Sequence, residues 1–229
     1  MNYTIQRVNA PPPLTADWEA PGWSAASTGR IEAYHPKSTR HRPRTEFRLL
    51  ADDSALYLQF RVHDRYVRCV HTEFNSNVCK DSCVEFFVRP GTSGPYFNFE
   101  FNAGGMLLAS CMRDWRRLAN GFGDCRRFTH EQCAAIRVAT TLPGVIDPEI
   151  TEPCTWVLAT HIPLALMRED LPMLSTAPGT VWQANFYKCA SDCSHPHWGS
   201  WSPLAETLNF HLPQFFGTLT FADAPRSNA

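Results

Sequence analysis

Two short alternating stretches carry carboxylate and amide side chains that could bind a polar ligand. The stretch CVEFFVR places one carboxylate, Glu85, among apolar neighbours on one face of a predicted strand. In YFNFEFN, three phenylalanines point one way, and Asn98, Glu100 and Asn102 point the other way. An amide-acid-amide row offers both hydrogen-bond donors and acceptors, which suits a ligand rich in hydroxyl groups, although a solvent-facing strand would show the same row.

A second set of candidates lies in the long stretch Val181–Phe221. It opens and closes with alternating strands, and between them runs a segment dense in Cys, His, Trp and Pro that has neither a helical nor a strand period. Long ordered loops of this kind are usually functional. The candidate ligand-contacting residues in this stretch, together with one tryptophan from an earlier predicted loop, are Asn185, Lys188, Trp198, Trp201 and Trp115.

The same loop contains four residues that could bind zinc. Cys189, Cys193, His195 and His197 supply two thiols and two imidazoles within nine residues, and this is a zinc-compatible set. The spacing is not that of a familiar zinc finger, and ordinary packing would explain the same residues. A zinc-binding structural or interaction protein is therefore an alternative, and we expect no stoichiometric zinc at these four residues.

A third class of function is a glycoside hydrolase. Such enzymes need two carboxylates flanking a cleft, and Glu85 with Glu100 is the pair on neighbouring strands that could supply them. No other feature of the sequence marks a hydrolase site. We therefore expect no catalytic residue, with hydrolysis of O-glycosyl bonds as the activity to test.

Composition argues against partners that depend on electrostatic attraction. The chain has 229 residues, a formal net charge of −1 and 19% charged residues, so neither nucleic acid nor an anionic membrane is an expected partner. The expected partner is a carbohydrate ligand, and the pattern gives no indication of oligomeric state.

No apolar run of about 18 residues and no secretory h-region is present, which predicts a cytoplasmic protein as written, or an exported one if a leader has been trimmed away. In the cytoplasm most of the nine cysteines would be free thiols.

The turn-separated alternating stretches predict an all-β fold with very little helix. We expect about ten strands in an antiparallel two-sheet β-sandwich of jelly-roll or immunoglobulin-like type, forming a single domain over residues 1–229. Segment 3–6 is expected at a sheet edge, segment 111–124 as a surface loop presenting Trp115, and segment 133–139 as a strand. The predicted core residues between the sheets are Leu58, Phe60, Phe86, Phe99, Phe101 and Phe186.

The order of these pieces resembles the family 9 carbohydrate-binding modules. The stretches that carry the resemblance, over about residues 14–222, are ADDSALYLQFRVHD, KDSCVEFFV, YFNFEFNAGG, WQANFYK, WGSWSP and FHLPQFFGTLTF. The resemblance implies a sugar-binding β-sandwich, often with structural calcium, and its best-known bacterial members accompany xylan-degrading enzymes. It places the acid that contacts sugar hydroxyls at Glu85, and Pro213 of the closing motif places a stacking aromatic at Phe210 or His211.

A sugar site needs a flat aromatic surface surrounded by polar groups. A pyranose presents an apolar C–H face and a ring of hydroxyls, and the candidates above supply both kinds of contact. The sequence therefore predicts non-catalytic binding of a carbohydrate, with a plant cell-wall polysaccharide or its oligosaccharides as the expected ligand and calcium as an expected structural ion.

Overall fold

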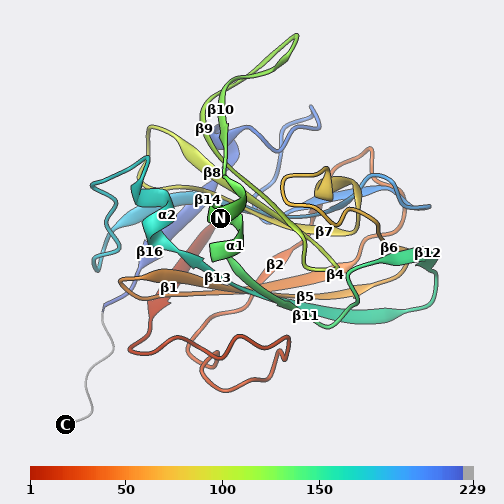
Figure 1. The fold of residues 1–229 in the computed structure, drawn as a ribbon, viewed down its shortest axis with the longest axis horizontal. Coiled ribbons are helices and arrows are strands. Elements are labelled where there is room, and N and C mark those ends of the chain that lie inside the picture. Colours follow the sequence, from red (N-terminus) through yellow and green to blue (C-terminus); the bar gives the residue numbers. More distant parts are fainter. Residues whose placement is uncertain (224–229) are drawn as a thin grey trace.

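The computed structural model describes residues 1–223, and almost all of its regular structure is β-strand (Figure 1). The strands are β1 (Asn2–Arg7), β2 (Gly29–Ile31), β3 (Ala33–Tyr34), β4 (Arg44–Ala51), β5 (Ala55–Asp64), β6 (Val67–Cys69), β7 (Cys83–Arg89), β8 (Tyr96–Asn102), β9 (Leu107–Leu118), β10 (Gly121–Arg127), β11 (Arg137–Thr140), β12 (Ile146–Ile150), β13 (Cys154–Pro163), β14 (Val181–Ala190), β15 (His197–Ser200) and β16 (Gly217–Phe221). The helices are α1 (His130–Ala135) and α2 (Leu164–Arg168), with 3-10 turns at Val78–Lys80 and Pro213–Phe215. The predicted all-β class is confirmed.

The first strand, β1, joins two groups of strands into one mixed sheet. The main path runs β10-β9-β8-β7-β14-β16-β1-β4-β5-β13-β11, and a separate two-stranded sheet pairs β12 with β6. Residues 2–5 of β1 pair parallel with β16, and residues 6–7 pair parallel with β4. The prediction of two separate antiparallel sheets was therefore too simple, and segment 3–6 is not at an edge. It has hydrogen-bonded neighbours on both sides, a position that its own alternation could not indicate.

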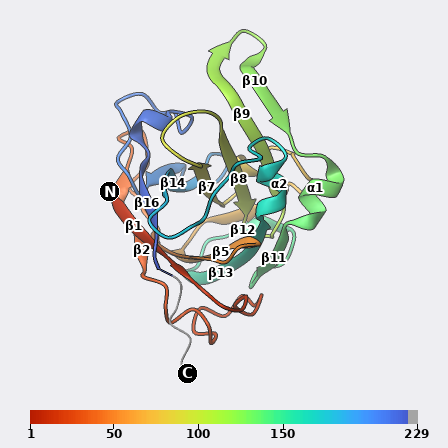
Figure 2. The same ribbon diagram turned by 90° about the vertical axis from the view of Figure 1, so that its left-hand side faces the viewer.

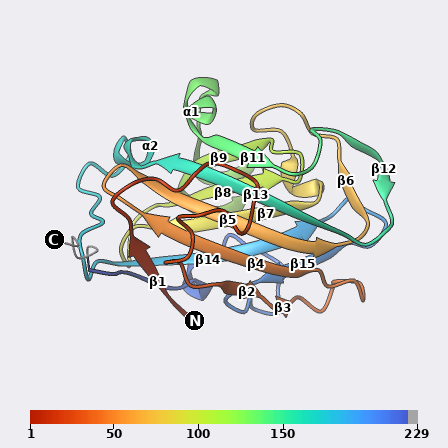
Figure 3. The same ribbon diagram turned by 90° about the horizontal axis from the view of Figure 1, so that it is seen from below.

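The mixed sheet doubles over, so that β4, β5 and β13 form a layer against β7, β8 and β14 (Figure 3). Phe47 of β4 stacks on Phe186 of β14 with ring centroids 3.6 Å apart and planes at 15°. Trp201 packs edge-on against both rings. Aromatic contacts between the layers thus fill the core, and the six predicted core residues, Leu58, Phe60, Phe86, Phe99, Phe101 and Phe186, are all fully buried.

Two segments differ from their predicted structure because of local signals. Segment 111–124 is not a loop but most of the β9–β10 hairpin, which projects beyond the rest of the sheet in Figures 1 and 2. Its two turn residues are Ala119 and Asn120, and Gly121 follows with φ +127°, a value that glycine adopts readily. Residues 130–135 form α1, because Thr129 and Gln132 make a reciprocal capping box. The strand predicted over 133–139 is therefore present only from Arg137, in β11.

Two further features concern the whole chain. None of the helices within residues 1–223 has the length and hydrophobicity needed to cross a bilayer. All nine cysteines lie in the described part of the chain and are free thiols, six of them buried. The fold is therefore held together by its apolar core and its sheet hydrogen bonds rather than by covalent cross-links.

Candidate functional site

A pocket of about 190 Å³ lies on the outer face of β7, β8 and β14, on the side away from the phenylalanine core. Strand alternation produces this face, because the odd-numbered residues of β7 point opposite to Phe86. Register then aligns Tyr187, Glu85 and Glu100 across the three strands. The residues lining the pocket are Cys79, Glu85, Phe87, Glu100, Arg117, Cys189, Ser191, Trp198, Leu208, Asn209, Phe210 and His211. The structure therefore gathers five of the predicted site residues: Glu85, Glu100, Trp198, Phe210 and His211.

The pocket contains two buried carboxyl groups that face each other across β7 and β8. Glu85 is 2% exposed and Glu100 is 5% exposed. One oxygen of Glu100, Oε1, accepts a hydrogen bond from Asn98 Nδ2 at 2.8 Å, whereas Oε2 has no hydrogen-bond partner. Burial raises the pKa of both carboxyl groups. The pair can therefore accept hydrogen bonds from a ligand, or donate one when protonated.

One wall of the pocket is aromatic. Phe210 lies flat on Tyr187, with ring centroids 4.0 Å apart and planes at 7°, and the Tyr187 hydroxyl donates to the Phe210 carbonyl at 3.1 Å. Both Phe210 and Trp198 are partly exposed where they line the pocket. Tyr187 thus holds the ring of Phe210 in a fixed plane, which a flat apolar ligand face could contact.

Two basic side chains complete the lining. Burial lowers the pKa of His211 to about 3, with Arg117 and Arg127 adding to the effect, so the imidazole is neutral at physiological pH. Tyr96 lies beside it, with its hydroxyl 2.7 Å from His211 Nδ1. Arg117 comes from the projecting end of β9 and brings a guanidinium group to the lining. The sequence prediction missed Arg117, because residues 111–124 had been interpreted as a separate loop.

Three predicted residues on the same side of the sheet do not line the pocket. Asn98 is buried and holds Glu100, as described above. The Trp115 ring packs near Tyr96 and under the Arg89 guanidinium, at 5.7 and 5.0 Å. The Asn185 side chain is bonded to the backbone of Ser202 in both directions. These side chains support neighbouring segments and do not face the pocket.

Two other predicted residues point into the space between the layers. Lys188 is fully buried, and its Nζ lies 3.3 Å from Asp64 Oδ2 and 2.9 Å from His197 Nε2. It follows Tyr187 on β14, so alternation turns it away from the pocket. Trp201 belongs to the core described above. Neither residue can contact a ligand in the pocket, which corrects their assignment to the site.

The four zinc candidates have different surroundings. Cys189 faces the pocket, whereas the Cys193 thiol donates to the Ala190 carbonyl. His195 stacks on Tyr66 with ring centroids 3.6 Å apart, and His197 contacts Lys188 in the interior.

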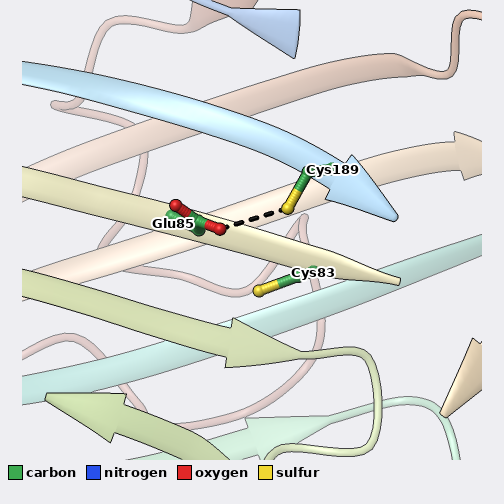
Figure 4. Close-up of side chains that lie close together, drawn as sticks. All are labelled: Cys83, Glu85 and Cys189. Atoms are coloured by element: carbon green, nitrogen blue, oxygen red, sulfur yellow. Dashed lines mark hydrogen bonds between the residues drawn. The ribbon is translucent and has the colours of Figure 1, made fainter. Parts of the chain in front are cut away.

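A different group of metal-binding side chains does converge. Within residues 1–223, the one set of three or more Cys, His, Asp or Glu side chains with ligand atoms within 4.8 Å of one another is Cys83, Glu85 and Cys189 (Figure 4). Two thiols do not suit calcium, which prefers oxygen ligands. This set therefore offers no support for the expected calcium ion.

Comparison with known proteins identifies the family. The sequence profile of carbohydrate-binding family 9 matches residues 25–221, most of the chain. The chain belongs to carbohydrate-binding family 9. No curated protein matches this family 9 chain.

Solved structures share the fold over nearly the whole chain. A candidate carbohydrate-binding protein from Bacteroides uniformis is 26% identical, with a TM-score of 0.77 over 96% of this chain and 98% of that one. A family 9 carbohydrate-binding module from Caldicellulosiruptor kristjanssonii, in complex with cellotriose, is 15% identical, with a TM-score of 0.63 over 100% and 97% of the two chains. The same module in complex with glucose matches at 15% identity and a TM-score of 0.63, over 99% and 98%.

Proposed function

We propose that this family 9 chain binds a saccharide, without cleaving it, in the pocket formed by β7, β8, β14 and the segment 198–211. The observation that carries the proposal is that Glu85 and Glu100 line the same pocket as the partly exposed rings of Phe210 and Trp198. Carboxyl groups bond sugar hydroxyls, and a flat ring packs against the apolar face of a pyranose. Glu100 Oε2 is a buried acceptor without a partner, and a ligand hydroxyl would satisfy it.

The size of the pocket limits the part of the ligand that enters it. Pockets for drug-sized ligands usually span roughly 300–1,000 Å³, and this pocket measures about 190 Å³. We therefore infer a site for one sugar residue, either a monosaccharide or the end of a chain. The glucose and cellotriose bound to the Caldicellulosiruptor module support a glucose-containing ligand, with plant cell-wall oligosaccharides as the ligand class.

The test is to replace Glu85 and measure affinity. A ligand is first identified on a glycan array and its affinity then measured by calorimetry. Leaving a buried sugar hydroxyl without its partner costs about 1–3 kcal/mol, so Glu85→Gln should weaken binding roughly 5- to 150-fold. The exposed Glu131, on α1, supplies the matched control Glu131→Gln, which should bind like the wild type. Equal affinities for all three proteins would place the sugar elsewhere.

The carboxyl pair also makes hydrolysis worth a direct assay. Glu85 and Glu100 are directly opposed on adjacent strands, and retaining glycosidases hold their two carboxyl groups about 5–5.5 Å apart. Against this, Glu85 Oε1 is already bonded to the Cys189 thiol at 3.1 Å. We expect no release of reducing sugar from the bound oligosaccharide, and release that disappears in Glu100→Gln would establish the hydrolase instead.

A further inference from the structure

Cys83, Glu85 and Cys189 form a compact cluster (Figure 4), and two of them, Glu85 and Cys189, line the pocket. Cys83 of β7 and Cys189 of β14 are Cα partners in the antiparallel pairing, and Glu85 lies two residues along the same face of β7. Their ligand atoms all lie within 4.8 Å of one another, and Cys189 Sγ is 3.1 Å from Glu85 Oε1. Two central strands of the sheet thus hold the three side chains together without any loop.

The cluster lacks a positive partner. Each of the three groups is neutral or anionic, and none is more than 2% exposed. Within residues 1–223, no Lys, Arg or His nitrogen forms a salt bridge with Glu85, and the adjacent Lys188 points to the opposite face, where it pairs with Asp64. Buried carboxyl and thiol groups stay protonated unless a cation pairs with them, and a metal ion that displaces their protons would supply that charge.

A second, independent feature points to a ligand at this place. Glu100, opposite Glu85, has one buried oxygen without a hydrogen-bond partner and lines the same pocket. This unpaired oxygen could accept a hydrogen bond from a cation-bound water as well as from a ligand hydroxyl.

We propose that Cys83, Glu85 and Cys189 bind a thiophilic divalent cation of the zinc class, with its fourth coordination position facing the pocket. Zinc binds two thiolates and a carboxylate at about 2.3 and 2.0–2.2 Å, and tetrahedral geometry then requires ligand atoms about 3.6–3.8 Å apart. The ligand atoms of the cluster, all within 4.8 Å of one another, already lie close to this spacing. Sites with three protein ligands leave the fourth position to water or to a bound molecule. The open position would therefore lie next to Glu100 and the proposed sugar site.

The inference shares Glu85 with the sugar site but does not depend on sugar binding, so the test uses the metal alone. The reduced protein, kept under anaerobic conditions, is titrated with Co²⁺, which reports thiolate ligands by a charge-transfer band and tetrahedral geometry by its visible spectrum. We expect one equivalent of Co²⁺ to bind and one equivalent of Zn²⁺ to displace it. Cys83→Ser and Cys189→Ser should each weaken binding about 10-fold or more, since even second-shell changes cost about 10- to 100-fold.

The control is Cys125→Ser, at a partly exposed cysteine on β10 outside the cluster, which should bind Co²⁺ like the wild type. Circular dichroism and thermal unfolding verify that each variant is folded. If a cysteine variant does not fold, Glu85→Gln, which preserves the side-chain shape, should still weaken Co²⁺ binding. Absence of a thiolate band in the wild type, or the same band and affinity in Cys189→Ser and Glu85→Gln, would overturn the proposal, whatever the outcome of the sugar assays.

Discussion

The pKa values of two buried acids of this chain are shifted in opposite directions because the acids have different partners. Although burial by itself raises the pKa of Asp64, Lys188 and a hydrogen bond from His41 lower it well below its usual range. Glu100 is buried to a similar extent, and burial raises its pKa because the Asn98 hydrogen bond and the charges of Arg127 and Arg117 do not offset it. The partners rather than the depth of burial decide the direction of the pKa shift. Asp64 therefore acts as a structural anion, and Glu100 remains available to a ligand.

The aromatic wall leads to a prediction about one ring. Phe210→Ala should weaken saccharide binding roughly 2- to 12-fold, since ring stacking is worth about 0.5–1.5 kcal/mol beyond area burial. Trp115→Ala is the matched control, because that ring packs near Tyr96 and Arg89 and does not line the pocket. Calorimetry of both variants decides the point. A loss of affinity in Trp115→Ala but not in Phe210→Ala would mean that the sugar binds to the β9–β10 hairpin rather than to segment 198–211.

A buried histidine should make the fold sensitive to acid. Burial, together with Lys188, lowers the pKa of His197 from 6.5 to about 3; Asp64 opposes this shift, and the rings of His41 and Tyr34 also face it. The unfolded chain therefore binds a proton that the folded chain does not, and stability falls as the pH drops from about 6.5 towards 3. By pH 5 this histidine alone should cost about 2 kcal/mol.

Urea unfolding at pH 7 and pH 5 measures the loss. The variant His197→Asn, which has no titrating group at this position, should lose about 2 kcal/mol less than the wild type between the two pH values. Parallel losses in the two proteins would show that other groups cause the acid sensitivity.

At the scale of single elements, β16 depends on a glycine at its first residue. A Cβ added at Gly217 would lie 2.5 Å from Cζ3 of Trp201 and 2.9 Å from the Met1 carbonyl oxygen. The close approach of β16 to the core tryptophan and to the start of the chain therefore requires the absence of a side chain. This position also begins the strand that pairs with both β1 and β14.

Gly217→Ala should accordingly destabilise the protein by about 1–3 kcal/mol, the usual cost of overpacking. Gly144→Ala is the matched control, since a Cβ there would have no heavy atom within 4 Å. Chemical denaturation of the two variants tests the difference. Equal stabilities would mean that Trp201 moves aside without cost.

At the scale of the whole molecule, stability depends on contact between the two layers. β1 connects the layers through hydrogen bonds, but the stacked pair of Phe47 and Phe186 fills the space between them, with Trp201 against both rings. Lys188 and Asp64 form a buried ion pair in the same interior. The layers are thus joined by an apolar core with stacked aromatic rings, and the Lys188–Asp64 pair lies in the same interior.

Phe47→Ala should lower the free energy of unfolding by about 3–5 kcal/mol, because it removes a fully buried ring and leaves a cavity. Phe122→Ala, at a partly buried ring on the β10 hairpin, should cost much less. Denaturant unfolding followed by tryptophan fluorescence compares the two. A similar loss in both variants would argue against the layer contact as the main source of stability.

Much of this architecture follows from alternation along each strand. A period of two assigns each side chain to a face without knowledge of its neighbours, so the phenylalanine core and the outward orientation of Glu85 and Glu100 were predictable. The family followed from the order of the same stretches and was confirmed by the profile match. Local signals for the β9–β10 turn and for the α1 cap were also present in the sequence, but they were not recognised.

Which outward-facing side chains meet was decided only by the tertiary structure. Strand register brings Cys83 opposite Cys189. Packing of the β9–β10 hairpin and of segment 198–211 brings Arg117, His211 and Phe210 into the pocket that holds the carboxyl pair. The dual pairing of β1 and the burial of Lys188 against Asp64 also depend on contacts between residues far apart in the chain. Periodicity determines the face on which a residue lies, whereas a binding pocket depends on strand order and loop packing, which no single stretch of sequence encodes.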